Sequence, residues 1–210
     1  MKKDMKMDLV RKTVLWVIAL FFLTVNPVAA GEVTKQVQLT INRVISVLND
    51  PELKKPEKTS ERKAVIHRLL KESFDEVEFA RRSLIAHWKN LTADQQNEFA
   101  AVFSHLLETT YFEKIDDYMK EAGDFSADNI VFLDEKVKGR FAVVKTKVNI
   151  GSNGSIPVDY RMIYKNNQWV VCDLVIEGVS IVMNYRAQFN EILANSTFQE
   201  LLQRLQTKKS

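Results

Sequence analysis

Few residues in this chain have the types and spacing that catalysis or metal binding requires. The three histidines, His67, His87 and His105, lie twenty and eighteen residues apart, with no metal-ligand spacing between them. The single cysteine, Cys172, lies in an apolar run with no histidine near it in sequence, which indicates a buried, unreactive thiol. The chain also has no G-x-S-x-G motif and no glycine-rich phosphate loop. We therefore predict no metal and no nucleophilic catalysis.

Asp173 is the one residue whose position could carry enzyme chemistry. The strand pattern around it places its carboxylate on an apolar face, opposite Tyr160. A carboxylate in such a place can act as a general base, as in the steroid-isomerising enzymes with similar cone-shaped sheets. The alternative is structural: the carboxylate accepts hydrogen bonds from Tyr160, from backbone or from Arg186. We favour the structural role.

The elements that must position these residues divide the chain into a helical half and a strand half. Apolar residues at helical spacing predict helices over residues 33–48, 60–88 and 93–122, then around 181–193 and 198–205. Thr92 with Gln95, and Thr197 with Glu200, form capping boxes. Alternating apolar residues predict four strands at 129–134, 140–150, 156–165 and 168–176. The expected fold is α+β, with a four-stranded antiparallel meander wrapped by helices.

Turn lengths predict the register of the last three strands. The two-residue turn at 166–167 and a five-residue loop at 151–155 give these opposed pairs: Tyr160–Asp173, Val158–Val175, Met162–Val171, Val144–Met162 and Val148–Val158. Residues opposite each other share a face, so one face gathers most of the large apolar side chains. These are Ala142, Val144, Val148, Val158, Tyr160, Met162, Tyr164, Trp169, Val171 and Val175.

The first 30 residues have the pattern of a cleaved secretory signal peptide. A basic start precedes an apolar run at 13–25, and Val28-Ala29-Ala30 supplies small residues for cleavage. The apolar run is shorter than the roughly 20 residues that span a bilayer. Residues 31–210 then contain 25 basic and 25 acidic residues, a balance that excludes nucleic acid as a partner. We expect 31–210 to form one exported domain, stable without a disulfide.

Several stretches together resemble one protein family. Residues 169–180 read W-x-V-x-D-x-x-x-E-G-V-S and continue into N-Y-R-x-Q-F at 184–189. Residues 74–88, F-D-E-V-E-F-A-R-R-S-L-I-A-H-W, precede T-A-D-Q-Q-N-E-F at 92–99, and V-D-Y-R occupies 158–161. This combination resembles the periplasmic phospholipid-binding proteins of the Mla (maintenance of lipid asymmetry) pathway, also called toluene-tolerance proteins. The resemblance covers nearly all of residues 31–210.

The resemblance implies an NTF2-like fold around an apolar cavity and the function of a carrier. Such a carrier takes a diacyl phospholipid, as a monomer, between an outer-membrane lipoprotein–porin complex and an inner-membrane ABC transporter whose ring subunit has MCE domains. It implies no catalysis and no cofactor. Two further hypotheses stay open: a small NTF2-like enzyme that uses Asp173 as its base, and a periplasmic interaction module with a solid core and no ligand.

Lipid tails need a closed apolar site. Two acyl chains hold about 30 CH₂ groups, each worth roughly 0.8 kcal/mol out of water, so exposing them costs on the order of 20 kcal/mol. We expect the tails to contact the apolar sheet face and nearby helices through Trp88, Phe103, Leu106, Val144, Val148, Val158, Tyr160, Met162, Trp169, Val171 and Val175.

Overall fold

The computed structural model describes residues 31–122, 126–150 and 154–207, with side chains described up to 111 and again from 126. The predicted signal peptide, residues 1–30, lies outside them. The helices are α2 (Glu32–Asn49), α3 (Thr59–Ser73), α4 (Glu76–Leu84), α5 (Ala93–Ala122), α6 (Ile181–Asn195) and α7 (Phe198–Thr207). The strands are β1 (Ile130–Lys138), β2 (Phe141–Asn149), β3 (Ser155–Lys165), β4 (Gln168–Ile176) and β5 (Val179–Ser180). The α+β prediction is confirmed.

The sheet is an antiparallel meander in the order β1-β2-β3-β4-β5. It has one strand more than predicted, because the chain turns back after β4 and adds the two-residue strand β5. Glu177 and Gly178 make that turn with φ angles of 51° and 81°. Glycine adopts such angles at no steric cost, which suits Gly178 to a tight reversal. The turn leads directly into α6.

The predicted register of β3 and β4 is wrong beyond Val171. Met162 pairs with Val171 as expected, but a β-bulge at Cys172 then pairs Arg161 with Asp173 and Tyr160 with Leu174. A bulge inserts one residue, so every later side chain moves to the opposite face of the sheet. Asp173 and Val175 therefore lie on the same face as Arg161. Leu174 lies opposite Tyr160, where Asp173 was predicted, and Ile176 lies opposite Val158, where Val175 was predicted.

The predicted register of β2 and β3 is displaced by two residues. Val144 pairs with Tyr160, and Ala142 pairs with Met162. Val148 pairs with Ile156, and Thr146 takes the predicted place opposite Val158. A shift of two residues returns every side chain to its own face, so the apolar face of these strands is the predicted one. Residues 151–153 of the connecting loop lie outside the described chain.

The long helix predicted over 60–88 is interrupted. Phe74 forms a parallel bridge with Val171 at the edge of β4, and the Asp75 N–H donates to the Val171 carbonyl oxygen at 3.0 Å. The Asp75 carboxylate then accepts from the Glu78 N–H at 3.0 Å and caps α4. Both predicted capping boxes are confirmed: Thr92 and Gln95 bond each other's backbone N–H, as do Thr197 and Glu200.

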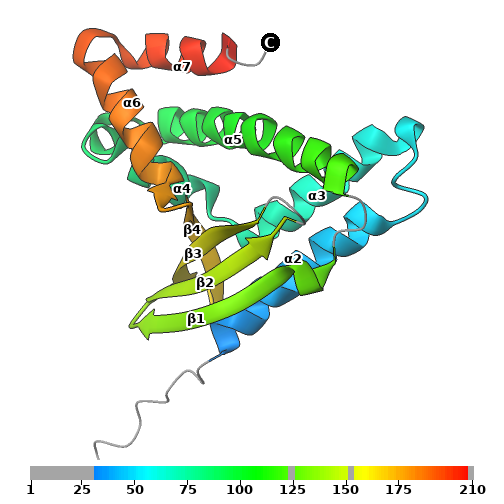
Figure 1. Ribbon diagram of the computed structural model, residues 1–210. Helices are drawn as coiled ribbons and strands as arrows, with labels where there is room; N and C mark the ends of the chain where they lie inside the picture. The colour runs from blue at the N-terminus through cyan, green and yellow to red at the C-terminus, as the bar shows by residue number, and fades with distance from the viewer. Residues whose placement is uncertain (1–30, 123–125, 151–153, 208–210) are drawn as a thin grey trace, which may run out of the picture.

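The core joins the sheet to all the longer helices except α3. In Figure 1, α2 runs along the sheet, while α5, α6 and α7 lie over one end of it, with α4 between them and β4. One cluster of buried residues includes Val33 and Val37 of α2, Phe103 of α5, Phe189 of α6 and Val171 of β4. Among the described helices, none has the length and apolarity needed to cross a membrane.

Candidate functional site

The inner face of the sheet is an apolar surface whose burial decreases along the strands. Next to the β3–β4 turn, Trp169 is buried and its partner Tyr164 is exposed, and in the following row Ala142, Met162 and Val171 are all buried. The next row, with Val144 and Tyr160, is partly open. The rows farther from the turn contain Thr146, which is buried, and five half-buried residues: Phe132, Val148, Ile156, Val158 and Ile176. An apolar surface that stays half-open within a fold of this size is typical of a binding site.

Tyr160 lies where the buried part of this face meets the open part. Desolvation by burial raises the pKa of its hydroxyl to about 12, although a hydrogen bond with Thr146 acts in the opposite direction. The side chain nevertheless keeps accessible surface. Tyr160 packs against the main core cluster and shares its row with Val144 and Leu174 on the inner face.

The predicted helical residues belong to an aromatic core. Phe103 contacts Tyr185 and Phe189, with ring centroids 5.0 and 5.3 Å apart, and stacks on Phe99 at 5.7 Å. Edge-to-face pairs at these distances stabilise a helical core without any ligand. Trp88 and Leu106 are buried in the same cluster. Packing within the core alone accounts for the burial of these three residues.

The structure brings together most of the eleven residues predicted to bind lipid. Seven share the main core cluster: Trp88, Phe103, Leu106, Val144, Met162, Trp169 and Val171. Tyr160 packs against that cluster, and Val148 and Val158 lie farther along the same face. The placement of Val175 was wrong, because the bulge at Cys172 turns it to the opposite face, where it pairs with Asp159. Partly buried apolar residues that pack against the same cluster and are absent from the predicted set include Ile41, Tyr111, Phe132, Leu174 and Ile176.

Asp173 is fully engaged in holding the corner between β4 and α6. Its Oδ2 accepts from the Ser180 hydroxyl at 2.6 Å and from Arg161 Nη1 at 3.0 Å, and its Oδ1 accepts from the Val182 N–H at 3.1 Å. The predicted partners Tyr160 and Arg186 are not among these donors. A carboxylate at a helix N-terminus that accepts charge-assisted bonds is a structural element. The geometry thus supports the structural hypothesis for Asp173.

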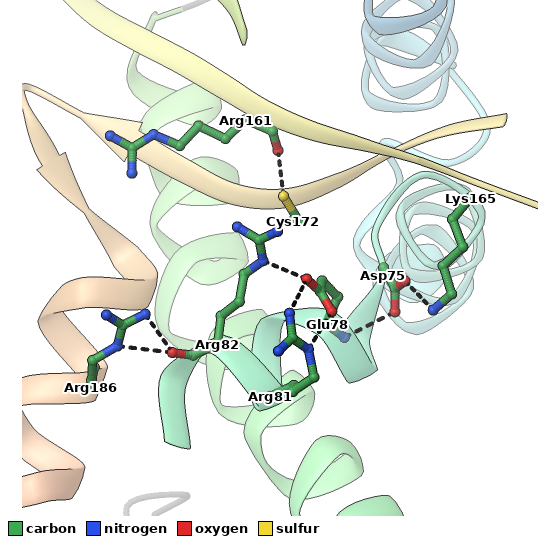
Figure 2. A network of polar contacts seen from close by, with 8 residues as sticks. All are labelled: Asp75, Glu78, Arg81, Arg82, Arg161, Lys165, Cys172 and Arg186. Carbon is green, nitrogen blue, oxygen red and sulfur yellow. Dashed lines mark hydrogen bonds and ion pairs between the residues drawn. The ribbon is translucent and has the colours of Figure 1, made fainter. Parts of the chain in front are cut away.

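A second polar cluster covers the outer face of β4 (Figure 2). Glu78 of α4 accepts from Arg81 at 2.6 and 2.7 Å and from Arg82 at 2.7 Å. Burial works to raise the pKa of Glu78, but the hydrogen bonds from both arginines outweigh it and hold the pKa below its usual value. Arg186 of α6 donates twice to the Arg82 carbonyl oxygen, at 3.0 and 2.7 Å. The cluster joins α4 to α6.

Cys172 is buried beside this cluster, and its thiol donates to the Arg161 carbonyl oxygen at 3.4 Å. Burial raises its pKa to about 11. At pH 8 the reactive thiolate is then roughly a thousandth of the population. We expect the thiol of the native protein to resist a maleimide or a disulfide reagent, and to react stoichiometrically in denaturant. Rapid modification of the folded protein would contradict the buried placement.

The histidines do not assemble a metal site. His67 Nδ1 lies 2.6 Å from Glu108 Oε1, and His105 Nδ1 lies 3.8 Å from Glu108 Oε2. Within residues 31–111, 126–150 and 154–207 no group of three or more His, Cys, Asp and Glu side chains is placed to hold a metal ion. His67 and Glu108 instead connect α3 to α5.

Two surface hollows lie away from the inner face. One, of about 240 Å³, is lined mainly by polar residues near Asp75 and Lys165. The other, of about 360 Å³, lies between His87 and Phe198. None of the residues predicted to bind lipid lines either hollow. The inner face of the sheet therefore remains the candidate site.

The fold and the inner face together define an α+β protein in which an antiparallel sheet and helices share one apolar core. The chain matches the MlaC protein family over residues 38–207, and it belongs to that family. No curated protein matches it significantly.

The fold is similar to that of a solved structure, a phospholipid-binding protein from Ralstonia solanacearum in complex with a phospholipid. The two share 20% sequence identity, with a TM-score of 0.69, over 83% of this chain and 95% of the other. At this level of identity the likeness shows the fold.

Proposed function

We propose that this protein is a periplasmic phospholipid carrier that holds the acyl chains between the inner face of the sheet and the helices. The observation that carries the proposal is the graded apolar face, buried at Met162 and Val171 and half-open from Tyr160 to Val148. Membership of the MlaC family and the fold shared with a phospholipid-binding protein support it.

The size of the hydrophobic effect explains why such a carrier needs partners. Releasing two acyl chains into water costs on the order of 20 kcal/mol, so spontaneous release is negligible. Loading and unloading then require contact with a protein that offers another apolar path. We propose that these partners are an outer-membrane lipoprotein–porin complex and an inner-membrane ABC transporter with an MCE-domain ring, which the protein meets as a monomer.

The lipid contacts that we propose differ from the predicted set. The half-buried residues Val148, Val158, Tyr160, Leu174 and Ile176 face the open part of the interior and are the ones that tails would reach first. The buried row with Met162 and Val171 forms the closed end. Trp88, Phe103 and Leu106 belong to the same core cluster as Met162 and Val171 and pack on the helical side of it.

Native mass spectrometry of the protein purified from cells without denaturant tests the proposal. We expect a species heavier than the polypeptide by one diacyl phospholipid, which fragments to the bare chain on activation. The identity of the released lipid follows from its own mass. A polypeptide that is free of lipid in every preparation would support the ligand-free interaction module instead.

A further inference from the structure

The N-terminus of α2 is held by a carboxylate from a distant strand. Glu135 of β1 accepts from the Gly31 nitrogen at 2.9 Å with one oxygen. Its other oxygen accepts from the Thr34 N–H at 2.7 Å and from the Thr34 hydroxyl. Gly31 itself has no side chain that could cap the helix. Glu135 thus performs the capping that α2 lacks in its own sequence.

This carboxylate lies on the inner, apolar face of the sheet. Glu135 pairs with Val144, which pairs with Tyr160, which in turn pairs with Leu174, so the four share one row. Burial works to raise the pKa of Glu135, but the hydrogen bonds from Thr34 and Gly31 outweigh it and keep the pKa below its usual value. A half-buried carboxylate on an apolar face needs a strong partner.

The sequence places a predicted cleavage point directly before the first of these donors. Val28-Ala29-Ala30 ends the predicted signal peptide, and Gly31 follows. Before cleavage the Gly31 nitrogen is a neutral amide. Hydrolysis adds OH to the Ala30 carbonyl carbon and a proton to the Gly31 nitrogen, which takes a second proton from water and becomes an ammonium group.

We propose that cleavage between Ala30 and Gly31 by a signal peptidase creates an ammonium group that forms an ion pair with Glu135. The 2.9 Å separation is already that of an ion pair, so no rearrangement is needed. The mature N-terminus then anchors α2 to β1. Farther along α2, the Gln36 side chain bonds both backbone groups of Trp169 in β4. Processing thus completes the attachment of α2 across the sheet.

The charged groups around this pair are few. The row that Glu135 shares carries only one other ionisable group, the Tyr160 phenol, whose pKa of about 12 keeps it neutral under ordinary conditions. On α2 the nearest charged residues in sequence, Glu32 and Lys35, are exposed to solvent. The new ammonium group therefore meets Glu135 as its dominant partner.

Protein exported from the full-length gene provides the test. N-terminal sequencing should give Gly31 as the first residue, and any other first residue would overturn the proposal. The α-amino group should titrate at a higher pH than the usual value of about 8, as followed by NMR, and return to that value in Glu135→Gln. An ordinary titration that Glu135→Gln leaves unchanged would also overturn it.

A double-mutant cycle measures the coupling. Inserting Gly-Ser between Ala30 and Gly31 moves the ammonium group two residues away but keeps the Gly31 N–H as a neutral donor. We expect Glu135→Gln to raise the unfolding equilibrium constant about tenfold more in the chain that starts at Gly31 than in the extended chain. Thr34→Ala is the matched control, which should have equal effects in both. Equal effects of Glu135→Gln in both chains would leave only helix capping and overturn the ion pair.

Discussion

Replacing Val158 with tryptophan is expected to expel bound phospholipid and leave the protein folded. Val158 lies on the inner face in the half-buried part, where a larger side chain extends into the space that we assign to lipid tails. Each methylene that it displaces costs about 0.8 kcal/mol, so losing three or four weakens tail binding on the order of a hundredfold. Native mass spectrometry should then show a larger lipid-free fraction than in the unsubstituted protein, with an unchanged circular dichroism spectrum.

Val143→Trp is the matched control for this prediction. Val143 lies on the neighbouring strand, is also half-buried and faces the opposite side of the sheet, where it pairs with Arg161. Its replacement should leave the lipid content unchanged. If Val158→Trp folds and retains a full complement of lipid, or if both variants lose it equally, the inner face is not the lipid site.

Met162 and Val171 are less suitable than Val158 for the tryptophan substitution because both are buried in the core. They are only 3% and 4% exposed, so tryptophan at either position must displace packed core atoms. Such overpacking usually costs about 1–3 kcal/mol of stability. Loss of lipid in these variants would then mix a blocked site with a distorted fold.

The order of helices and strands was predictable because the hydrophobic period changes twice along the chain, from helical to alternating and back to helical. Spacing of three and four defines α2, α3 and α5, and alternation defines the strands. The two capping boxes are local, so their residues alone predict the start of α5 and α7. The break at Phe74 was missed because its cause is a bridge to Val171, nearly one hundred residues away.

The bulge at Cys172 could not be predicted from the strand itself. Residues 169–176 read W-V-V-C-D-L-V-I, with apolar side chains at both odd and even positions. Either face of β4 can therefore pack against apolar groups, and alternation does not decide the register. The two-residue shift of β2 against β3 was not predicted for a related reason, since such a shift leaves the same residues on each face. The bulge alone accounts for the misplacement of Val175 and the omission of Leu174.

The bulge also explains why Asp173 is better understood as a structural residue than as a catalytic base. In the predicted register its carboxylate would face Tyr160 on the apolar side and would need a partner there. With one extra residue in β4, it turns to the face of Arg161 and reaches Ser180 and the first turn of α6. The W-x-V-x-D-x-x-x-E-G-V-S stretch therefore encodes a corner: strand, bulge, anchoring carboxylate, tight turn and helix cap.

Replacing Asp173 with alanine is expected to destabilise the protein by about 3 kcal/mol. The side chain is 3% exposed, and its removal leaves the Ser180 hydroxyl and the Val182 N–H without their acceptor in a buried corner. Arg161, which is 44% exposed, can regain water, so its loss of a partner adds less than a fully buried charge would. Urea unfolding followed by tryptophan fluorescence measures the change.

Asp159→Ala is the control that separates this corner from an ordinary surface ion pair. Asp159 lies two residues from Arg161 on the same face and meets Lys145 at 3.9 Å with both side chains partly exposed, so its loss should cost less than about 1 kcal/mol. Ser180→Ala should cost about 1 kcal/mol as a lost helix cap, and should cost less when Asp173 is already alanine, because the two side chains bond each other. A structural Asp173 thus requires a large, coupled loss of stability. A stable Asp173→Ala protein that keeps its lipid would show instead that the turn and α6 hold this corner without the carboxylate.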